Sequence, residues 1–488
     1  MIKKILFLIT IIGSIILSCS DNTHNRHRKD TVAFDLDSIR ARGRLVAVTD
    51  FSSTSYFIYR GETMGFHYEL LKAFADHLGV DLEIIAENNI EDAFEMLYTG
   101  KADLLAMGLT INPSGKEEIR FTEPVVNTRK VLVQRKPHKW ETMSHSVLEN
   151  KLLRNLSDLA GKTLYIQKGS SHAEQFYSMT NEAGEPVSVV EVPDDAEALI
   201  QLVDKGEIDY TVCDENIAVV NASYLPDIDV KTPVSLPQDL AWGIRKINSD
   251  QLQQEFNNWI NNFRKTQAYA LFYAKYFRNS HSGTIFRSDY YALNTGKISP
   301  WDNIIKVFSN SIKWDWRLLA SLIYQESRFI PDVESKAGAY GLMQIMPETG
   351  KNYGIDITSS PRDNMEAGAK YINWLHSIFD PKIPDENERT KFILASYNAG
   401  PGHVLDAMKL AEKNGNDPTI WNDNVAVWLL KKSEPQYYTD KVVKNGYFKG
   451  KESVAFVNEV LERYEHYKNI VPDNEPLSFS PQGGKEIL

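Results

Sequence analysis

The sequence predicts a multidomain protein, with a two-lobed α/β domain followed by a domain made mainly of helices. The chain has 488 residues, which is too many for a single hydrophobic core. From residue 44 onward predicted strands and helices alternate, and the same alternation returns after residue 161, which favours two similar α/β lobes. After residue 297 only helical periodicity remains.

Composition narrows the classes of function. With 42% hydrophobic and 24% charged residues, the chain has the composition of a folded globular protein. Its net charge of -11 argues against nucleic acid as a partner, because nucleic-acid binders usually present a basic face. The sequence contains neither a metal-ligand spacing nor a phosphate-binding loop, so we expect no metal and no cofactor.

The first residues have the pattern of an export signal. Lys3 and Lys4 precede an uncharged, mostly apolar run over residues 5–17, which is short for a membrane span and suits the core of a signal peptide. The run ends in ILSCS, which resembles a bacterial lipobox. This resemblance implies a signal peptide over residues 1–18 and a lipid on Cys19; the alternative is an ordinary signal peptide cleaved at a small residue.

Residues 19–43 are predicted to form a tether, because they begin with a polar stretch that has no apolar periodicity. Acylation of Cys19 would leave Cys213 without a cysteine partner, so we expect no intramolecular disulfide. An exported chain with a lipid anchor would reside in the cell envelope of a Gram-negative bacterium. We expect it at the outer membrane, facing the periplasm.

The first folded region, residues 44–280, has the strand and helix patterns of an α/β sheet. RLVAVTD and DLEIIAE are β-rich runs, and MGFHYELLKAFADHLGV between them is an amphipathic helix that ends at Gly79. The alternation returns in KTLYIQKGS, EALIQLVDKGEIDYTVCDE and LAWGIRK. Together with GKADLLAMGLTINP and IRFTEPV, these runs resemble the family of periplasmic solute-binding proteins that capture polar amino acids.

This resemblance covers residues 44–278 and implies a periplasmic-binding-protein-like fold of type II, in which two lobes close on a ligand. It places the two hinge crossovers near residues 131–135 and 237–245.

Only part of the family's pocket transfers to this chain. Gly115 stands where the family has an arginine that clamps the ligand's carboxylate, and Arg120 or Lys116 could replace that arginine only if the backbone placed them correctly. Asp214 matches the acid that pairs with the ligand's amino group, and Ser170 begins a predicted helix whose amides could hold an anion. We therefore expect a regulatory domain with little affinity for free amino acids, and muropeptides are the candidate ligands.

A stretch over residues 281–297, rich in Ser, Asn and Gly, is the predicted linker to a helical domain over residues 298–470, with a tail over 471–488. WDWRLLASLIYQESRF predicts a helix that has Asp315 as its N-cap and stops before Pro331. NMEAGAKYINWLHSIF, RTKFILASYNAG and SVAFVNEVLERYEHY predict three more helices.

Glu326 lies on the apolar side of the first of these helices. It follows Leu319, Leu322 and Ile323 at helical spacing, so its side chain is aligned with theirs. An apolar environment raises the pKa of a carboxyl, which suits a general acid. From position alone, the alternative is a structural carboxylate held in an ion pair.

Three motifs bear on this choice. ESRF at residues 326–329, GAYGLMQIMPETG at 338–350 and ASYNAGPGHV at 395–404 jointly resemble the soluble-lytic-transglycosylase family, whose fold is lysozyme-like. The resemblance implies that Glu326 is the catalytic acid. It also implies a set of substrate-binding residues: Ser327, Gly341, Met343, Gln344, Tyr397 and Asn398.

Two positions qualify this resemblance. For Met343 the alternative role is that of a core residue, because methionine commonly fills gaps between packed helices. Phe456 stands where the family usually has a tyrosine, so any role of that hydroxyl is lost here. We expect an altered rate or altered packing of the cleft rather than loss of activity.

The resemblance implies cleavage of the β-1,4 bond between N-acetylmuramic acid and N-acetylglucosamine in peptidoglycan glycan strands. No second acidic residue stands at the family's conserved motif positions, and the resemblance implies that Glu326 protonates the leaving oxygen and then deprotonates the muramyl 6-hydroxyl, which gives a 1,6-anhydro end. Two alternatives stay open: a lysozyme-like hydrolase of the same polymer, and a solute-binding sensor with an inactive helical domain.

Overall fold

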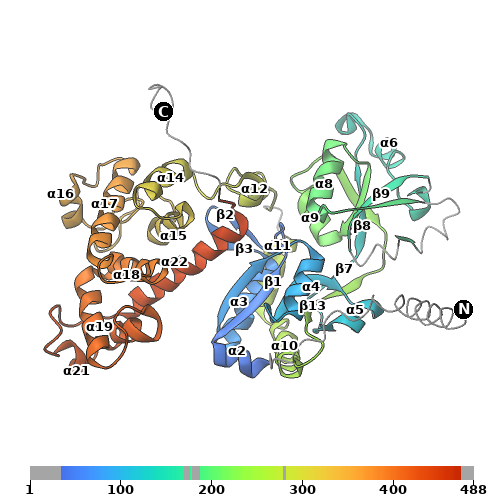
Figure 1. Cartoon of the computed structure of the whole chain (residues 1–488). Helices are drawn as coiled ribbons and strands as arrows, with labels where there is room; N and C mark the ends of the chain where they lie inside the picture. Colours follow the sequence, from blue (N-terminus) through green and yellow to red (C-terminus); the bar gives the residue numbers. More distant parts are fainter. Residues whose placement is uncertain (1–34, 160, 170–175, 178–186, 279–281, 474–488) are drawn as a thin grey trace, which may run out of the picture.

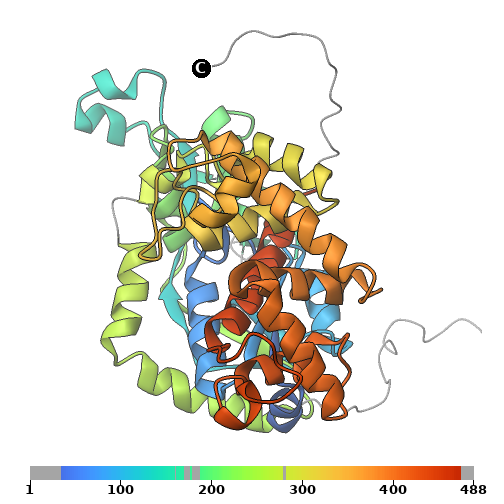
Figure 2. The same cartoon turned by 90° about the vertical axis from the view of Figure 1, so that its left-hand side faces the viewer.

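The computed structural model describes residues 35–159, 161–169, 176–177, 187–278 and 282–473. Figure 1 shows a helical domain beside two α/β lobes, and the view in Figure 2 looks onto the helical domain with the lobes behind it. Cys19 and Ser170, both singled out in the sequence, lie outside the described residues.

The first lobe is built on a mixed sheet. Its strands are β1 (Arg44–Thr49), β4 (Asp81–Ala86), β5 (Leu104–Thr110), β6 (Arg120–Phe121), β7 (Val126–Thr128) and β13 (Gln238–Ile244). The strand order is β4-β1-β5-β13-β6, with β7 also pairing β13. β1 is parallel to β4 and β5, whereas β13 runs antiparallel to its neighbours. A separate hairpin is formed by β2 (Phe57–Tyr59) and β3 (Glu62–Met64).

The second lobe repeats this arrangement, as the alternating pattern predicted. Its strands are β8 (Lys130–Arg135), β9 (Thr163–Gln167), β10 (Ser188–Val192), β11 (Tyr210–Asp214) and β12 (Ile228–Pro233). The order is β10-β9-β11-β8-β12, with parallel pairing on the β10 side and antiparallel pairing around β8.

The chain crosses between the lobes just before the positions expected from the sequence. β7 belongs to the first sheet and β8 to the second, so the first crossover is at Arg129. The second crossover lies between Pro233, the end of β12, and Gln238, the start of β13. The expected hinges at residues 131–135 and 237–245 were therefore wrong, because these apolar runs form strands inside the sheets and a strand pattern does not show which sheet it joins.

Helices cover both sheets. Those of the first lobe are α2 (Leu36–Arg42), α3 (Phe66–Leu78), α4 (Ile90–Tyr98), α5 (Pro113–Glu118), α10 (Asp250–Phe263) and α11 (Gln267–Phe277). Those of the second lobe are α6 (His145–Glu149), α8 (Ala196–Lys205) and α9 (Glu215–Ala222), with 3-10 turns at Trp140–Thr142 and Leu156–Leu159. As expected, α3 ends at Gly79, which takes the left-handed conformation with a φ of 70°.

Two segments are more ordered than their composition suggested. The predicted tether over residues 19–43 includes α2, whose Leu36 and Ile39 are buried in the core of the first lobe. The predicted linker contains α12 (Ser282–Phe286) and α13 (Ala292–Thr295), and the Tyr291 ring between them packs 5.5 Å from Phe57. A few buried aromatic or aliphatic side chains suffice to fix a polar segment, and composition averages hide them.

The second domain is helical throughout its described part. Its helices are α14 (Asp302–Ser311), α15 (Trp316–Ser327), α16 (Pro347–Tyr353), α17 (Pro361–Phe379), α18 (Glu386–Ala399), α19 (Pro401–Lys413), α20 (Ala426–Lys431), α21 (Pro435–Tyr438) and α22 (Lys451–Ile470), with a π-type turn at Trp421–Val425. α15 lies in the centre, because Leu319, Leu322 and Ile323 are each 0% exposed.

Helix α22 joins the two domains. It packs along α15, where the Ser321 hydroxyl donates to the Val460 carbonyl at 2.6 Å. Its C-terminal end lies against the first lobe, and Figure 1 shows it running from the helical domain toward β2 and β3. There the Tyr467 hydroxyl donates to the Gly61 carbonyl at 2.8 Å, and the Tyr56 hydroxyl lies 2.8 Å from His466 Nδ1.

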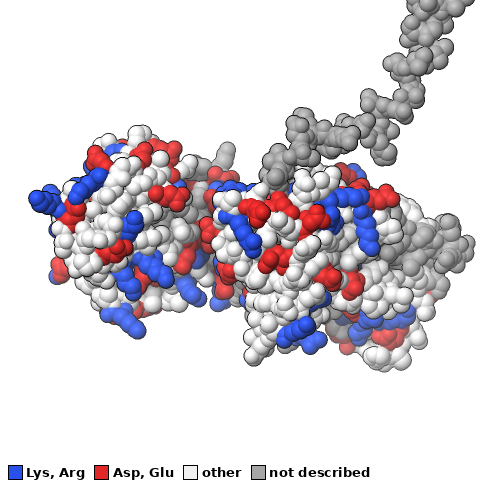
Figure 3. Space-filling model, turned by 90° about the horizontal axis from the view of Figure 1, so that it is seen from below, with Lys and Arg blue, Asp and Glu red and all other residues white. Residues whose placement is uncertain are grey.

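Charged side chains are mixed on the face seen in Figure 3. Lysines, arginines, aspartates and glutamates are interspersed over both domains on that face. In the part of the chain that the structure describes, no helix has the length and apolar character needed to cross a membrane.

Candidate active site

Glu326 is positioned by the last turn of α15. The helix begins at the expected N-cap, where the Asp315 carboxylate accepts from the Arg317 backbone N–H at 2.8 Å. It ends at Ser327, one residue after Glu326, because Arg328 and Phe329 have φ values of 51° and 62°. Consecutive left-handed residues other than glycine are uncommon, and here they turn the chain out of the helix directly after the acid.

The Glu326 carboxyl is half-buried and unpaired. No described residue forms a hydrogen bond or an ion pair with it, so the alternative of a structural ion pair is not what the structure shows. Burial raises the pKa of Glu326 to about 8, since the surrounding protein atoms penalise the charged form. The carboxyl is therefore mostly protonated at neutral pH, as a general acid requires.

Tyr397 lies beside Glu326 at the C-terminal end of α18. Burial and the Glu326 charge raise the pKa of the Tyr397 hydroxyl well above its usual value, so the phenol keeps its proton. That proton is directed to the Met343 carbonyl, to which the hydroxyl donates at 2.7 Å. The hydroxyl thereby links two of the sequence motifs at the acid.

Asn364 of α17 holds the loop between α15 and α16 by hydrogen bonds to its backbone. This buried side chain accepts from the Met343 backbone N–H at 2.8 Å and donates to the Tyr340 carbonyl at 3.1 Å. A Cβ at Gly341, where φ is 78°, would lie 2.4 Å from the Asn364 amide nitrogen. Gly341 thus permits a close approach that no larger residue allows. Asn364 was missed in the sequence, because its partner loop lies more than a helical turn away along the chain.

Two of the expected substrate-binding side chains do not face the cleft. Met343 is 0% exposed and packs against Gly368, so its side chain is a core residue and only its backbone serves the site. Ser327 is 5% exposed, and its hydroxyl donates to the Ile323 carbonyl at 3.1 Å within α15. Substrate binding by Ser327 and Met343 therefore stays a prediction, and any such contact would come from their backbone atoms. A motif letter does not show whether a side chain or its backbone is used.

Gln344 and Asn398 are more accessible. The Gln344 side-chain amide donates to the carbonyls of Val333 and Gly341, both at 2.9 Å, which leaves its oxygen as an acceptor. Asn398 is exposed, and its oxygen accepts from the Ser453 hydroxyl of α22 at 2.6 Å. Ser453 is a second residue that the sequence did not single out.

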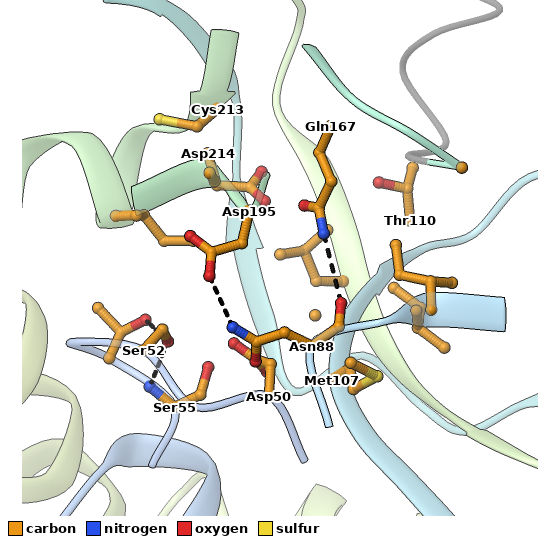
Figure 4. Close-up of a pocket in the computed structure, with 18 of the residues that line it drawn as sticks. Asp50, Ser52, Ser55, Asn88, Met107, Thr110, Gln167, Asp195, Cys213 and Asp214 are labelled. Carbon is orange, nitrogen blue, oxygen red and sulfur yellow. Dashed lines mark hydrogen bonds between the residues drawn. The ribbon is translucent and has the colours of Figure 1, made fainter. Parts of the chain in front are cut away.

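A second site lies in the cleft between the two α/β lobes, which encloses a cavity of about 620 Å³ (Figure 4). Its wall is acidic, and among the described lining residues Lys130 is the one lysine or arginine. The lining carboxylates are Asp50, Glu91, Glu118, Glu191, Asp195, Glu197 and Asp214. A cavity with this wall is electrostatically complementary to cationic or amine-bearing groups.

Asp214 already has a cationic partner within the protein. The Lys130 ammonium lies 2.8 Å from its carboxylate, and both side chains are largely buried. This pair occupies the acid that the sequence assigned to a ligand's amino group. Lys130 was missed because it is distant in sequence and begins a strand of the sheet.

Neither Arg120 nor Lys116 takes the place of the arginine clamp. A Cβ at Gly115 would lie 2.9 Å from both the Asn112 amide oxygen and the Phe121 ring, so the turn has little room for a side chain. Arg120 is turned toward Asp250, and Lys116 is exposed and does not line the cavity.

The two lobes are in direct contact across the cleft. The Ser53 backbone N–H donates to the Glu197 carboxylate at 3.0 Å, and the Asn88 amide donates to Asp195 at 2.7 Å, as Figure 4 shows for the second pair. Burial raises the pKa of Glu197 to about 7. Glu197 and Asp195 both come from the N-terminal end of α8, so this helix end closes the cleft.

Metal binding has no support in the part of the chain that the structure describes. No group of three or more His, Cys, Asp or Glu side chains there could hold an ion.

Two family models match separate parts of the chain. Bacterial extracellular solute-binding proteins, family 3, match residues 44–279, and the transglycosylase SLT domain matches residues 304–420. The fold and the two sites thus define a class, namely a transglycosylase whose catalytic domain follows a solute-binding domain. This is the fold class and the enzyme class that the motifs predicted.

Curated relatives carry both parts in one chain. The chain is 31% identical over 432 residues to the membrane-bound lytic murein transglycosylase F of Desulfosudis oleivorans, covering 88% of this chain and 91% of that protein. It is 32% identical over 436 residues to the protein of the same name from Pseudomonas fluorescens, with coverage of 88% and 86%. The chain therefore belongs to the membrane-bound lytic murein transglycosylase F family.

Among solved structures, an ancestral amino acid-binding protein, a precursor of cyclohexadienyl dehydratase, matches at 25% identity. The match has a TM-score of 0.42 and covers 50% of this chain and 99% of that one.

Proposed function

We propose that this protein cleaves the β-1,4 bond between N-acetylmuramic acid and N-acetylglucosamine in peptidoglycan and releases 1,6-anhydro-muramyl ends. The observation that carries the proposal is the carboxyl of Glu326, which has no partner among the described residues and whose pKa is raised by burial. Membership of the family indicates that the polymer is peptidoglycan, and the geometry of the site indicates that Glu326 is the acid.

The chemistry needs one carboxyl in two successive roles. Glu326 first donates its proton to the leaving glycosidic oxygen, and the resulting carboxylate then takes the proton of the muramyl 6-hydroxyl, which attacks the anomeric carbon of the same sugar. Burial is the only cause of the raised pKa, and no neighbouring charge contributes to it. Retaining and inverting glycosidases instead use two carboxyl groups placed across the bond that is cut.

Product analysis tests this proposal against hydrolysis. The full chain without its N-terminal signal is incubated with purified peptidoglycan, and the fragments are analysed by mass spectrometry. Anhydro-muramyl ends support transglycosylation, whereas reducing muramyl ends would show a lysozyme-like hydrolase. Intact peptidoglycan would leave only a binding function.

We further propose that the solute-binding domain is regulatory and that a muropeptide closes it. The cleft loop over residues 51–56 supports this idea, because it contacts the other lobe and the catalytic domain at once. Its Ser53 holds Glu197 of the second lobe, and its Tyr56 holds His466 of α22. α22 in turn packs along α15, which carries Glu326.

A second contact reaches α15 directly. The turn of the β2–β3 hairpin packs closely against the end of this helix. A Cβ at Gly61 would lie 2.7 Å from the Tyr324 ring and 2.5 Å from the Phe329 ring, so the contact has no room for a side chain at Gly61. These residues flank Glu326 in sequence. A ligand that moved the first lobe relative to the helical domain would act on both contacts.

A variant of the loop tests the regulatory proposal. Muropeptide is titrated into the full chain while glycan cleavage is measured, and Tyr56→Phe is compared with Tyr276→Phe, a matched tyrosine in the first lobe whose hydroxyl donates to Glu69. We expect a several-fold response in the wild type and in the Tyr276 variant, since couplings are typically about 1–3 kcal/mol, and a reduced response in the Tyr56 variant. A wild type that does not respond would contradict the proposal.

The location of the protein follows from its first residues. We propose that a lipid on Cys19 anchors it to the outer membrane, with both domains in the periplasm and in reach of peptidoglycan. Membrane fractionation of the wild type and of Cys19→Ala tests this, and an unchanged distribution would contradict it.

A further inference from the structure

Two aromatic rings of α17 stack on each other near the proposed catalytic acid. Tyr371 and Trp374 lie one turn apart on α17, and their rings stack with centroids 5.5 Å apart and an interplanar angle of 20°. The Tyr371 ring also lies 5.4 Å from the Tyr397 ring. The Glu326 charge raises the pKa of the Tyr397 hydroxyl, so Tyr397 lies near the acid. The three rings therefore form a row from the surroundings of Glu326 to Trp374.

Trp374 is not required by the core. Its side chain is 46% exposed, while the buried face of α17 is formed by other residues, among them Met365, Ile372, Leu375 and Phe379. Neither the Trp374 indole N–H nor the Tyr371 hydroxyl donates a hydrogen bond to another described residue. A large ring with an unused donor, exposed beside an active site, has the properties of a ligand contact.

We infer that Tyr371 and Trp374 form a stacking platform for a sugar ring of the glycan strand, beyond the sugars joined by the bond that is cut. The apolar C–H face of a hexose packs on an aromatic ring, and the indole N–H can donate to one of its hydroxyl groups. The row of rings from Tyr397 to Trp374 connects the platform with the surroundings of Glu326, and this connection selects a glycan strand as the occupant. The inference rests on the proposed function for the identity of that polymer.

Position in the row predicts the kinetic signature. Trp374 lies at the far end from Glu326, so its ring contributes to binding and not to proton transfer. Loss of the ring therefore raises KM for long glycan strands and leaves kcat unchanged. A substrate too short to reach Trp374 does not respond.

The test uses three variants of the full chain without its signal peptide. Trp374→Leu keeps an apolar side chain but removes the ring face, Trp374→Phe retains a ring, and Tyr98→Leu changes an aromatic residue of α4 in the first lobe that is 40% exposed. We expect KM for long strands to rise about two- to tenfold in Trp374→Leu, on the scale of aromatic contacts, and to stay near the wild-type value in the other two.

Binding without cleavage gives an independent readout. Co-sedimentation with insoluble peptidoglycan compares Glu326→Gln with Glu326→Gln/Trp374→Leu, and we expect the double variant to bind more weakly by the same factor. If Trp374→Leu matches Tyr98→Leu in KM, and the double variant matches Glu326→Gln in co-sedimentation, while the wild type cleaves peptidoglycan, then the platform is wrong and the proposed function stands. If the wild type leaves peptidoglycan uncut, the proposed function fails, and the platform fails with it.

Discussion

The cleft between the α/β lobes and the C-terminal end of α15 are two sites that each contain an acid in a position where a ligand is expected. In the first cleft, Asp214 is neutralised by Lys130 at 2.8 Å. In the second, Glu326 has no partner among the described residues, and burial raises its pKa to about 8. The charge of a paired acid is neutralised by a cation of the same protein, so the acid stays ionised and holds no proton to donate. A buried acid without a partner keeps its proton and can transfer it.

The difference shows how one chain can keep a binding fold and change its use. The solute-binding domain retains two lobes, a hinge and a cavity, but it lacks the arginine clamp and uses its carboxylates for contacts within the protein. In the catalytic domain Glu326 has no partner among the described residues. This lowers the free energy of unfolding when the carboxyl is charged, because a buried charge without a partner is unfavourable.

The largest expected effect is that of Glu326→Gln on catalysis. The glutamine keeps the shape of the side chain but cannot exchange a proton, and general acids typically contribute about 10²–10⁴-fold. Because Glu326 acts in both steps, we expect a loss at the upper end of this range. Turnover of peptidoglycan is measured together with circular dichroism of the variant, and activity within tenfold of wild type would remove Glu326 from its role.

The next effect concerns the paired acid. Lys130→Met leaves Asp214 buried without its cation, and breaking a buried pair in this way costs about 3–5 kcal/mol. We expect the free energy of unfolding of the first domain to fall accordingly in urea titrations. The double variant Lys130→Met/Asp214→Leu removes both charges and should recover most of the loss; equal stability of Lys130→Met and wild type would show that the pair is not formed.

A smaller effect is expected on the pH dependence of stability. Glu326 has a pKa of about 8 when folded and 4.5 as a free side chain, so between these values the unfolded state releases a proton that the folded state keeps. Wild type should therefore lose stability relative to Glu326→Gln as pH rises from about 4.5 to 8. Thermal melting at several pH values measures this difference, and parallel profiles would contradict the raised pKa.

The smallest effect is expected at Phe456, where the resemblance led us to expect a tyrosine. The ring is 6% exposed in the core of the catalytic domain, one turn from Ser453, which binds Asn398. Phe456→Tyr adds a hydroxyl that costs about 1–3 kcal/mol of stability if it stays unpaired, with activity changed less than tenfold. A larger change in kcat, in either direction, would show that this position takes part in the reaction.

The sequence by itself determined the order of the domains, the class of enzyme and the position of Glu326 on the apolar side of its helix. Asp315 capped α15 and Gly79 ended α3 where expected, because caps are read from neighbouring residues. Glu326 was found for the same reason, since helical spacing aligned it with Leu319 and Leu322. These features depend on residues within a few turns of each other.

Only the tertiary structure decided which polar groups are paired within the protein and which have no partner among the described residues. Lys130 reaches Asp214 across the second sheet, Asn364 holds the Met343 backbone, and Tyr467 binds the hairpin of another domain. Each of these contacts joins residues that are far apart in the chain, and their sequence patterns are those of an ordinary strand or helix. Local periodicity fixes the direction of a side chain relative to its own helix or strand, but its partner is set by how whole elements pack, and that packing determines whether a carboxyl is paired or free to react.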